Sequence, residues 1–322
     1  MIDPTQTLVT IFGGSGFIGR YIVQCLARRG YRIRVGVRRP DLAGHLQPLG
    51  KVGQVMPVQA NVRYPDSVAA AVSGAHAVIN LVGVLSGSGA QSFDAVHVFG
   101  AEAVAEAARV AGAKRLIHFS AIGADPQSSS EYGRSKAEGE TRTFSAFPDS
   151  SVVRPSIVFG PEDDFFNRFA AMARFLPALP LIGGGHTLFQ PVYAVDVAEA
   201  VARLLETPSS EAKTYELGGP DVRSFKEIIA FTLATAGRKR LLVPVPWSVA
   251  RIQGAVLGLL PKPLLTLDQV EMLRKDNVVS PEAKADRRTL EGLGIQPQSI
   301  DAIVPAYLYR YRKAGQFTTV NG

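Results

Sequence analysis

The segment from Leu8 to Arg20 constrains the fold of this chain most, because it joins three local patterns in one order. Leu8–Phe12 is an apolar run typical of a parallel strand buried on both faces. A helical pattern of apolar residues begins at Phe17. Between the two, glycines stand at every third position: Gly13, Gly16 and Gly19. Strand, glycine-rich turn and helix in this order predict a nucleotide-binding βα unit.

Each glycine has an expected physical role in such a unit. The first permits a tight turn, the second lets a pyrophosphate approach the backbone, and the third lets the helix pack closely. The N-terminus of the helix adds free N–H groups and a partial positive charge. We therefore expect a dinucleotide here; a glycine turn that only closes a βα unit is the alternative. The expected contacts are Gly13, Ser15, Gly16, Phe17, Ile18 and Gly19.

Strand and helix patterns alternate through the first half of the 322-residue chain. Strands are expected near 32–37, 55–59, 77–82, 115–120 and 151–154, and helices near 92–111 and from Glu131 onwards. This alternation predicts an α/β fold, namely a Rossmann-type doubly wound parallel sheet. After Pro155 the pattern is mixed, with helices expected at 195–205 and 225–236 and a strand at 214–217.

The change of pattern near residue 155 indicates the domain organisation. We expect a dinucleotide-binding domain over residues 1–155 and a smaller, mixed α/β C-terminal region over 156–322 that serves substrate binding or interaction. Some segments of this second region should return to the sheet. Ligands of open α/β sheets bind at the carboxyl ends of the strands, so the second region should lie there.

Composition limits the remaining possibilities. Cys25 is the single cysteine, which excludes a disulfide scaffold and a cysteine-based metal site, and we expect no metal. The first strand begins so early that no signal peptide is expected. No run of about 20 apolar residues predicts a membrane span. The net charge of +7 can attract phosphates or anionic lipid, but no aromatic-basic interleaving favours nucleic acid. A cytoplasmic bacterial protein fits this composition.

The end of the second strand indicates which dinucleotide is preferred. NAD-binding sites usually place an acid there, for the ribose hydroxyls, whereas this chain continues with Arg38 and Arg39. Two guanidiniums suit a 2′-phosphate, so NADP(H) is expected over NAD(H). Two solvated loop arginines are the alternative interpretation. Further contacts are expected from residues that follow the third and fourth strands: Asn61, Val62, Leu81, Val82 and Gly83.

Tyr132 and Lys136 are the candidate catalytic pair. Their i, i+4 spacing places both on one face of a helix, where the ammonium favours the phenolate of a general acid/base. The lysine can also bond the nicotinamide ribose. Ser120 ends the fifth strand, and two residues later stands Ile122, which has no hydroxyl to complete the site. Residues 128–130 are three serines that could substitute for it.

The motifs of the central region carry a resemblance to a known family. They are the stretches 128–140, 153–163, 167–170 and 190–198. They resemble the atypical branch of the short-chain dehydrogenase/reductase superfamily that contains the nucleotide-binding accessory subunit of mitochondrial complex I. Bacterial relatives associated with ubiquinone metabolism belong to the same branch. The resemblance covers residues 7–310 and implies a bound, structural NADPH. It also implies dinucleotide contacts from Ser120, Tyr132, Lys136, Pro155 and Ile157.

The last third of the chain could contribute an interaction surface. Residues 247–265 are apolar with basic flanks, a pattern that suits an anionic membrane surface or a partner helix, and a helix packed inward is the alternative. The aromatic and basic residues 307–313 form either a docking tail or the last turns of a helix.

Three functions remain open from the sequence. The first is an NADP(H)-binding protein of the complex I accessory-subunit type, with complex I or quinone-pathway proteins as partners and a peripheral membrane contact. The second is an active NAD(P)-dependent oxidoreductase or sugar-nucleotide epimerase/dehydratase that uses Tyr132 and Lys136. The third is an NADP(H)-sensing regulator that binds no substrate.

Overall fold

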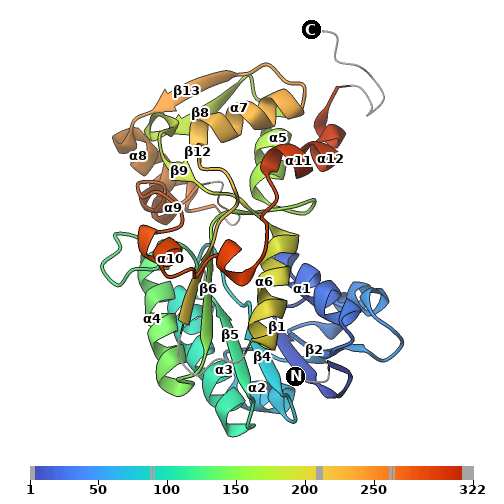
Figure 1. Ribbon diagram of the computed structural model, residues 1–322. Helices are drawn as coiled ribbons and strands as arrows, with labels where there is room; N and C mark the ends of the chain where they lie inside the picture. The colour runs from blue at the N-terminus through green and yellow to red at the C-terminus, as the bar shows by residue number, and fades with distance from the viewer. Residues whose placement is uncertain are drawn as a thin grey trace. The chain divides into compact units, whose positions relative to one another are not determined.

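The computed structural model describes residues 4–313 except 88, 90, 208–212, 261, 262 and 264 (Figure 1). The chain divides into two compact units. The first consists of Met1–Pro155, Ala194–Leu217 and Ser280–Gln296, and the second of Ser156–Tyr193, Gly218–Val279 and Pro297–Gly322. Residues 194–217 and 280–296 thus belong with the N-terminal sheet. Among the described residues, no helix combines the length and hydropathy that a membrane crossing needs.

A seven-stranded sheet forms the centre of the first unit, in the order β11-β6-β5-β4-β1-β2-β3. Every pair of neighbours is parallel. The strands are β1 Leu8–Phe12, β2 Arg32–Val37, β3 Val55–Gln59, β4 Ala77–Asn80, β5 Arg115–Phe119, β6 Ser151–Pro155 and β11 Lys213–Leu217. The strand order reverses between β1 and β4, which creates the crevice where doubly wound folds bind ligands. The predicted fold class is confirmed.

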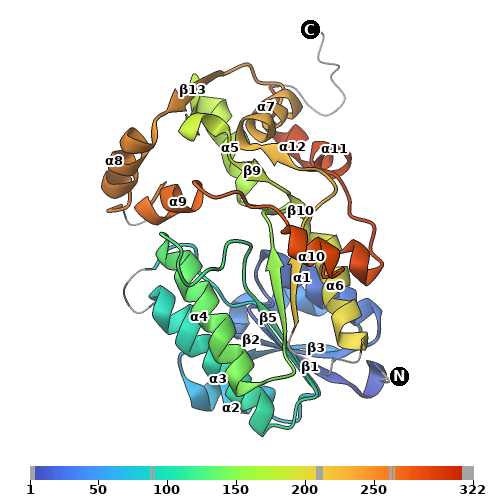
Figure 2. The ribbon, with the colours of Figure 1, turned by 60° about the vertical axis from the view of Figure 1, so that its left-hand side comes forward.

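Helices cover both faces of this sheet (Figures 1 and 2). On one face α1 packs against α6, and on the other α3 packs against both α2 and α4. The helices are α1 Phe17–Arg28, α2 Pro65–Val72, α3 Phe99–Val110, α4 Glu131–Ala146 and α6 Ala194–Glu206, and the short α10 Pro281–Ala285 also belongs to this unit. Apolar residues of the strands and of α2 and α3, such as Phe12, Val68 and Val104, form a continuous core.

Two predicted boundaries need correction. The fourth strand was expected over 77–82, but β4 ends at Asn80, because the Asn80 side chain accepts a hydrogen bond from the Val82 N–H (3.1 Å) and turns the chain. The helix expected near 92–111 is α-helical only from Phe99, and a π-helical turn, Asp94–Val98, precedes it. Single π-turns of this kind recur at functional sites.

The second unit combines short strand pairs with helices. Parallel pairs join β7 Val158–Phe159 to β10 Val192–Tyr193 and β8 Ala178–Ile182 to β13 Leu241–Val245, and β9 Leu188–Phe189 pairs antiparallel with β12 Arg223–Ser224. The helices are α5 Phe165–Phe175, α7 Phe225–Thr235, α8 Trp247–Leu257, α9 Leu267–Met272, α11 Ile300–Ile303 and α12 Pro305–Leu308. Phenylalanines of α5, α7 and β7 dominate its core.

Asp163 and Tyr307 connect the C-terminal helices to α5. The Asp163 carboxylate accepts hydrogen bonds from the Phe166 N–H (2.7 Å) and from the Tyr307 hydroxyl (2.5 Å). Both residues are buried, and burial raises the pKa of the Asp163 carboxyl. Tyr307 is therefore a core residue of the last helices, and the interpretation of 307–313 as a free docking tail is wrong for this side chain.

Candidate functional site

The glycine turn has the geometry that a dinucleotide site needs. Gly13 has a φ of +78°, which favours glycine, and its carbonyl accepts a hydrogen bond from the Gly16 N–H (3.0 Å). A Cβ at Gly19 would lie 2.5 Å from the Gly13 oxygen and from the Gly14 Cα. The third glycine therefore brings α1 against the turn itself. Gly14, which the sequence analysis passed over, packs just as closely on Val35 of β2.

The first turn of α1 presents an open, uncapped end. Gly16 is exposed, and a Cβ there would meet only the Gly13 oxygen, at 3.3 Å. Gly16 is also the N-cap residue, so no side chain bonds the N–H groups at the start of the helix. Ser15, Phe17 and Ile18 are half-buried around this end. The chain thus offers an accessible helix N-terminus and a backbone without a side chain, which together fit a pyrophosphate.

The two arginines after β2 differ in their surroundings. Both are exposed, but Arg39 forms two hydrogen bonds to the Asp41 carboxylate, at 2.7 and 3.0 Å. The Arg39 guanidinium accordingly lowers the pKa of Asp41. Sequence analysis missed this acid, because it lies four residues beyond the end of β2. Arg38 makes no ion pair with any described residue and is the more available cation of the two.

The residues expected around the adenosine are divided between surface and core. The Asn61 side chain accepts a hydrogen bond from the Arg63 N–H (3.2 Å). Val62 is buried and packs so closely on α3 that a Cβ at Gly100 would lie 2.8 Å from it. Its role in this structure is core packing. Leu81 and Val82 are half-buried and Gly83 is exposed, all three at the carboxyl end of β4.

Lys136 and Tyr132 lie together at the start of α4. Lys136 is buried, and its Nζ donates a hydrogen bond to the Phe119 carbonyl at the end of β5 (3.0 Å). Nζ also lies 5.9 Å from the centre of the half-buried Tyr132 ring. Burial lowers the pKa of Lys136 from 10.5 to about 8, although the Glu140 carboxylate opposes the shift. The pair is assembled as its spacing predicts.

Two of the three serines that could supply the missing catalytic hydroxyl, Ser128 and Ser130, already bond the backbone. Ile122 is buried in the place where that hydroxyl is expected. Ser130 is the N-cap of α4, and its hydroxyl accepts a hydrogen bond from the Gly133 N–H (3.0 Å). The Ser128 hydroxyl accepts one from the Ser130 N–H (3.3 Å). Ser128 and Ser130 therefore build the turn into the helix, and only Ser129 of the three is exposed.

Ser120, Pro155 and Ile157 complete the expected contacts. Ser120 is buried at the end of β5, and its hydroxyl has no hydrogen-bond partner among the described residues. The Pro155 carbonyl, at the end of β6, accepts a hydrogen bond from the Ile122 N–H (3.1 Å). Ile157 lies in the second unit, where it packs partly buried against the phenylalanine core.

Three polar residues under the site were missed by sequence analysis. Asn80 is the last residue of β4 and His118 the last but one of the adjacent β5, and the two lie in contact, with 3.3 Å between Asn80 Nδ2 and His118 Nδ1. Burial and the nearby Lys136 ammonium lower the pKa of His118 to about 3. His97 lies in the π-turn and is also buried. Asn80 and His118 could have been found from the sequence, because each is a polar residue within an apolar strand run. No sequence pattern singles out His97.

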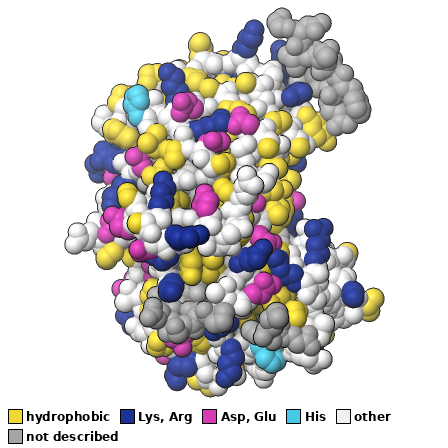
Figure 3. All heavy atoms as spheres, in the orientation of Figure 1, with side chains coloured by type: hydrophobic (Ala, Val, Ile, Leu, Met, Phe, Trp, Pro, Cys, Tyr) yellow, Lys and Arg dark blue, Asp and Glu magenta, His cyan; other side chains and the backbone are white. Residues whose placement is uncertain are grey.

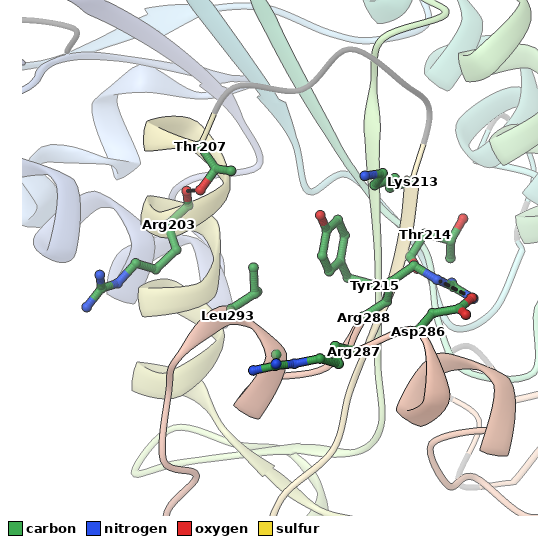
Figure 4. A pocket seen from close by; sticks show the side chains of 10 residues that line it. Arg203, Thr207, Lys213, Thr214, Tyr215, Asp286, Arg287, Arg288 and Leu293 are labelled. Carbon is green, nitrogen blue, oxygen red and sulfur yellow. Dashed lines mark hydrogen bonds and ion pairs between the residues drawn. The ribbon is translucent and has the colours of Figure 1, made fainter.

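A separate cavity of about 800 Å³ lies at the β11 edge of the sheet (Figure 4). It is open to solvent beside Lys213, the first residue of β11, and Thr207, just after α6. The glycine turn and Lys136 lie at the carboxyl ends of the strands, so this cavity is at the opposite end of the sheet. The described residues hold no cluster of three or more histidine, cysteine or acidic side chains placed to bind a metal ion.

Comparison with known proteins agrees with this geometry. Residues 9–218 match the NAD dependent epimerase/dehydratase family. The mitochondrial NADH dehydrogenase (ubiquinone) 1 alpha subcomplex subunit 9 of Arabidopsis thaliana is 36% identical over 96% of this chain and 79% of that protein. A ceramide reductase of Caulobacter vibrioides is 30% identical over 76% of each chain.

A solved structure shares the fold. It is the dTDP-glucose 4,6-dehydratase DesIV of Streptomyces venezuelae, with NAD and TYD bound, which aligns with a TM-score of 0.71 over 95% of this chain and 96% of its own. Its 18% sequence identity supports the fold alone. The resemblance predicted from the central motifs is confirmed by the match of sequence and by the homologues. The chain therefore belongs to the NAD dependent epimerase/dehydratase family and has complex I accessory subunits among its homologues.

Proposed function

We propose that this protein holds NADP(H) as a structural ligand and acts as a respiratory accessory protein of the complex I type. The observation that carries this proposal is a glycine turn and a buried lysine placed to suit a dinucleotide, beside a catalytic group in which one expected hydroxyl is replaced. Gly13, Gly16 and Lys136 have the geometry for a bound cofactor, whereas buried Ile122 stands in place of the substrate-polarising hydroxyl. The likeness to complex I subunits along nearly the whole chain supports the same function.

The residues of the cradle divide the work of holding the cofactor. The N-terminus of α1 would hold the pyrophosphate, Arg38 the 2′-phosphate, and Lys136 the nicotinamide ribose. When bound, the nicotinamide group supplies hydride-transfer chemistry. The chain itself offers a tyrosine hydroxyl for a proton, but Ile122 stands where the second donor is expected. One missing donor in such a site typically costs roughly 100- to 1000-fold in rate.

The second part of the proposal is a peripheral contact with an anionic membrane surface through the outer face of α8. This face consists of Val249, Ile252 and Val256, which recur at helical spacing and are 43%, 66% and 62% exposed. The covered side of the helix carries the buried residues Ala250 and Gly254, and the Trp247 ring packs partly buried against the same small core cluster. The inward-packed interpretation therefore holds for Trp247 and is wrong for Val249, Ile252 and Val256.

Basic and apolar side chains surround the outer face of α8. Leu259 is 87% exposed just beyond the helix, and Leu241 of β13 is 71% exposed before it. Lys239 is exposed beside β13, and Arg251 is exposed on α8 itself, where it also pairs with Glu271 (3.4 Å). Figure 3 shows hydrophobic and basic side chains next to one another over this part of the second unit. Such a mixture binds anionic lipid through apolar burial and charge together.

The cofactor part is tested by native mass spectrometry and calorimetry on the purified full-length protein. We expect NADP(H) to co-purify and, after its removal, NADPH to bind more tightly than NADH. A protein that binds neither dinucleotide would refute the proposal. A clear preference for NADH would remove the assignment of Arg38 to a 2′-phosphate.

A second candidate function is NADPH-dependent reduction of a lipid carbonyl. It is favoured by the intact Tyr132–Lys136 pair and by the ceramide reductase among the relatives. NADPH consumption with long-chain 3-keto lipids as substrates tests it. Turnover that Tyr132→Phe abolishes would establish this function, and no consumption by the NADPH-loaded protein would exclude it for those substrates.

A further inference from the structure

His97 lies beneath the start of α4, and neither proposed function uses it. It is 1% exposed and belongs to the π-turn that precedes α3. Its ring stacks on Phe93, with centroids 5.4 Å apart, and meets the edge of the Tyr132 ring, also at 5.4 Å. The histidine therefore lies between Phe93, just before the π-turn, and the candidate catalytic tyrosine.

The hydrogen bonds of His97 determine which ring nitrogen carries the proton. The Val84 N–H, in the loop after β4, donates to His97 Nε2 (3.0 Å), so Nε2 carries no proton. The proton is consequently on Nδ1, which lies 2.9 Å from the Ser135 hydroxyl. That hydroxyl in turn donates to the Tyr132 carbonyl (2.9 Å). One neutral imidazole thus links the β4 loop to the first turn of α4.

Two glycines make room for this link. A Cβ at Gly83 would lie 3.1 Å from Lys136 Nζ and 3.5 Å from His97 Nε2. A Cβ at Gly139 would lie only 2.2 Å from the His97 carbonyl oxygen, so α4 rests directly on the backbone of the π-turn. The loop, the lysine and the histidine therefore converge where the chain has no side chains to separate them.

The surroundings keep the imidazole neutral. Burial, followed by the positive charge of Lys136 and then the proximity of His118, lowers the pKa of His97 to about 3. A proton on Nε2 would also remove the bond from the Val84 N–H. The linking arrangement is therefore the same throughout the physiological pH range.

We propose that His97 is a positioning residue for dinucleotide binding. It holds the β4 loop, residues 81–84, at a fixed distance from the turn of α4 that carries Tyr132 and Lys136. A dinucleotide lying across the strand ends would contact both segments, and this inference rests on the cofactor site proposed above. Because the two segments are already ordered, dinucleotide binding loses less conformational entropy, and its affinity is higher.

Three substitutions separate the hydrogen bonds from simple packing. His97→Gln places an amide oxygen near the position of Nε2 and keeps an acceptor for the Val84 N–H. His97→Asn places an amide N–H near Nδ1 and keeps only the donor to Ser135. His97→Phe retains an aromatic ring and removes both bonds. The NADPH dissociation constant is measured by calorimetry at a temperature at which circular dichroism shows every variant folded.

The wild type must first bind NADPH, because its failure to do so would refute the cofactor site and not the role of His97. We expect His97→Phe to weaken binding roughly tenfold, the size expected for one ordinary hydrogen bond. His97→Gln should recover most of this loss and His97→Asn less. A loss in His97→Gln as large as or larger than that in His97→Phe would reduce His97 to a packing residue, and wild-type affinity in His97→Phe would overturn the proposal outright.

Discussion

At the scale of single residues, existing ion pairs and hydrogen bonds distinguish candidate site residues that look equivalent in the sequence. Arg38 and Arg39 are equivalent in the sequence, yet only Arg39 is paired with Asp41. In the same way, Ser128 and Ser130 could each replace a catalytic hydroxyl on paper, but both shape the entry to α4. The structure thereby reduces several chemically similar candidates to one arginine and removes two of the three serines.

The unequal arginines lead to a prediction about the 2′-phosphate. Arg38→Ala should weaken NADPH binding by roughly 10- to 100-fold, the range for a hydrogen bond to a charged group, and leave NADH binding nearly unchanged. Arg39→Ala is the matched control and should have the smaller effect, because its guanidinium is shared with Asp41. Calorimetry with both dinucleotides measures this. Equal losses for NADPH and NADH would contradict the assignment.

Lys136 gives a prediction about stability and pH. Its pKa is near 8 in the folded chain and near 10.5 when unfolded, so the unfolded chain binds more protons between these values and stability rises with pH there. Below pH 8 the buried ammonium costs roughly 3 kcal/mol of unfolding free energy, of which its bond to Phe119 offsets a part.

Lys136→Met should therefore stabilise the cofactor-free protein by about 1–2 kcal/mol at pH 7 and lose this advantage towards pH 10. The same variant should no longer be stabilised by NADPH. Urea unfolding with and without NADPH at the two pH values measures both effects. A cofactor-free variant less stable than the wild type at pH 7 would show that the buried lysine stabilises the fold.

At the scale of elements, the sequence predicts regular segments well and their ends poorly. The apolar run of β1, the glycine turn and the start of α4 at Glu131 follow from local pattern. The early end of β4 does not, because it depends on the bond that the Asn80 side chain accepts from the Val82 N–H. The π-turn before α3 does not either, because its His97 is bonded to the loop after β4. Helix α8 is another such case, since its pattern alone did not reveal which face the fold covers.

The outer face of α8 leads to a prediction about membrane binding. The full-length protein should co-sediment with anionic vesicles at low salt and release at high salt, because screening shortens the reach of its basic residues. The double variant Ile252→Asp, Val256→Asp should lose this binding. Val110→Asp, at a 78% exposed position of α3 in the first unit, is the matched control and should behave as the wild type. Equal loss in the control would contradict the role of α8.

At the scale of the whole molecule, fold class and family follow from the sequence, whereas the working of the site does not. Strand alternation and the central motifs predicted the doubly wound sheet and the family to which the chain belongs. The link from Val84 through His97 to Tyr132 joins segments that no local pattern connects, so only the structure reveals it. The glycine turn and the Tyr132–Lys136 pair have the expected geometry, whereas Ile122 is buried where a second catalytic hydroxyl is expected.

The central claim is that the protein works by holding its cofactor and not by turning over a substrate. The most direct measurement is NADH oxidation by membranes of a deletion strain complemented with the wild type, Tyr132→Phe or Lys136→Ala. We expect Tyr132→Phe, folded and NADPH-loaded, to restore oxidation as the wild type does. Lys136→Ala, which should hold NADPH less tightly, should restore it poorly. A folded, cofactor-loaded Tyr132→Phe protein that behaves like the deletion would contradict the account.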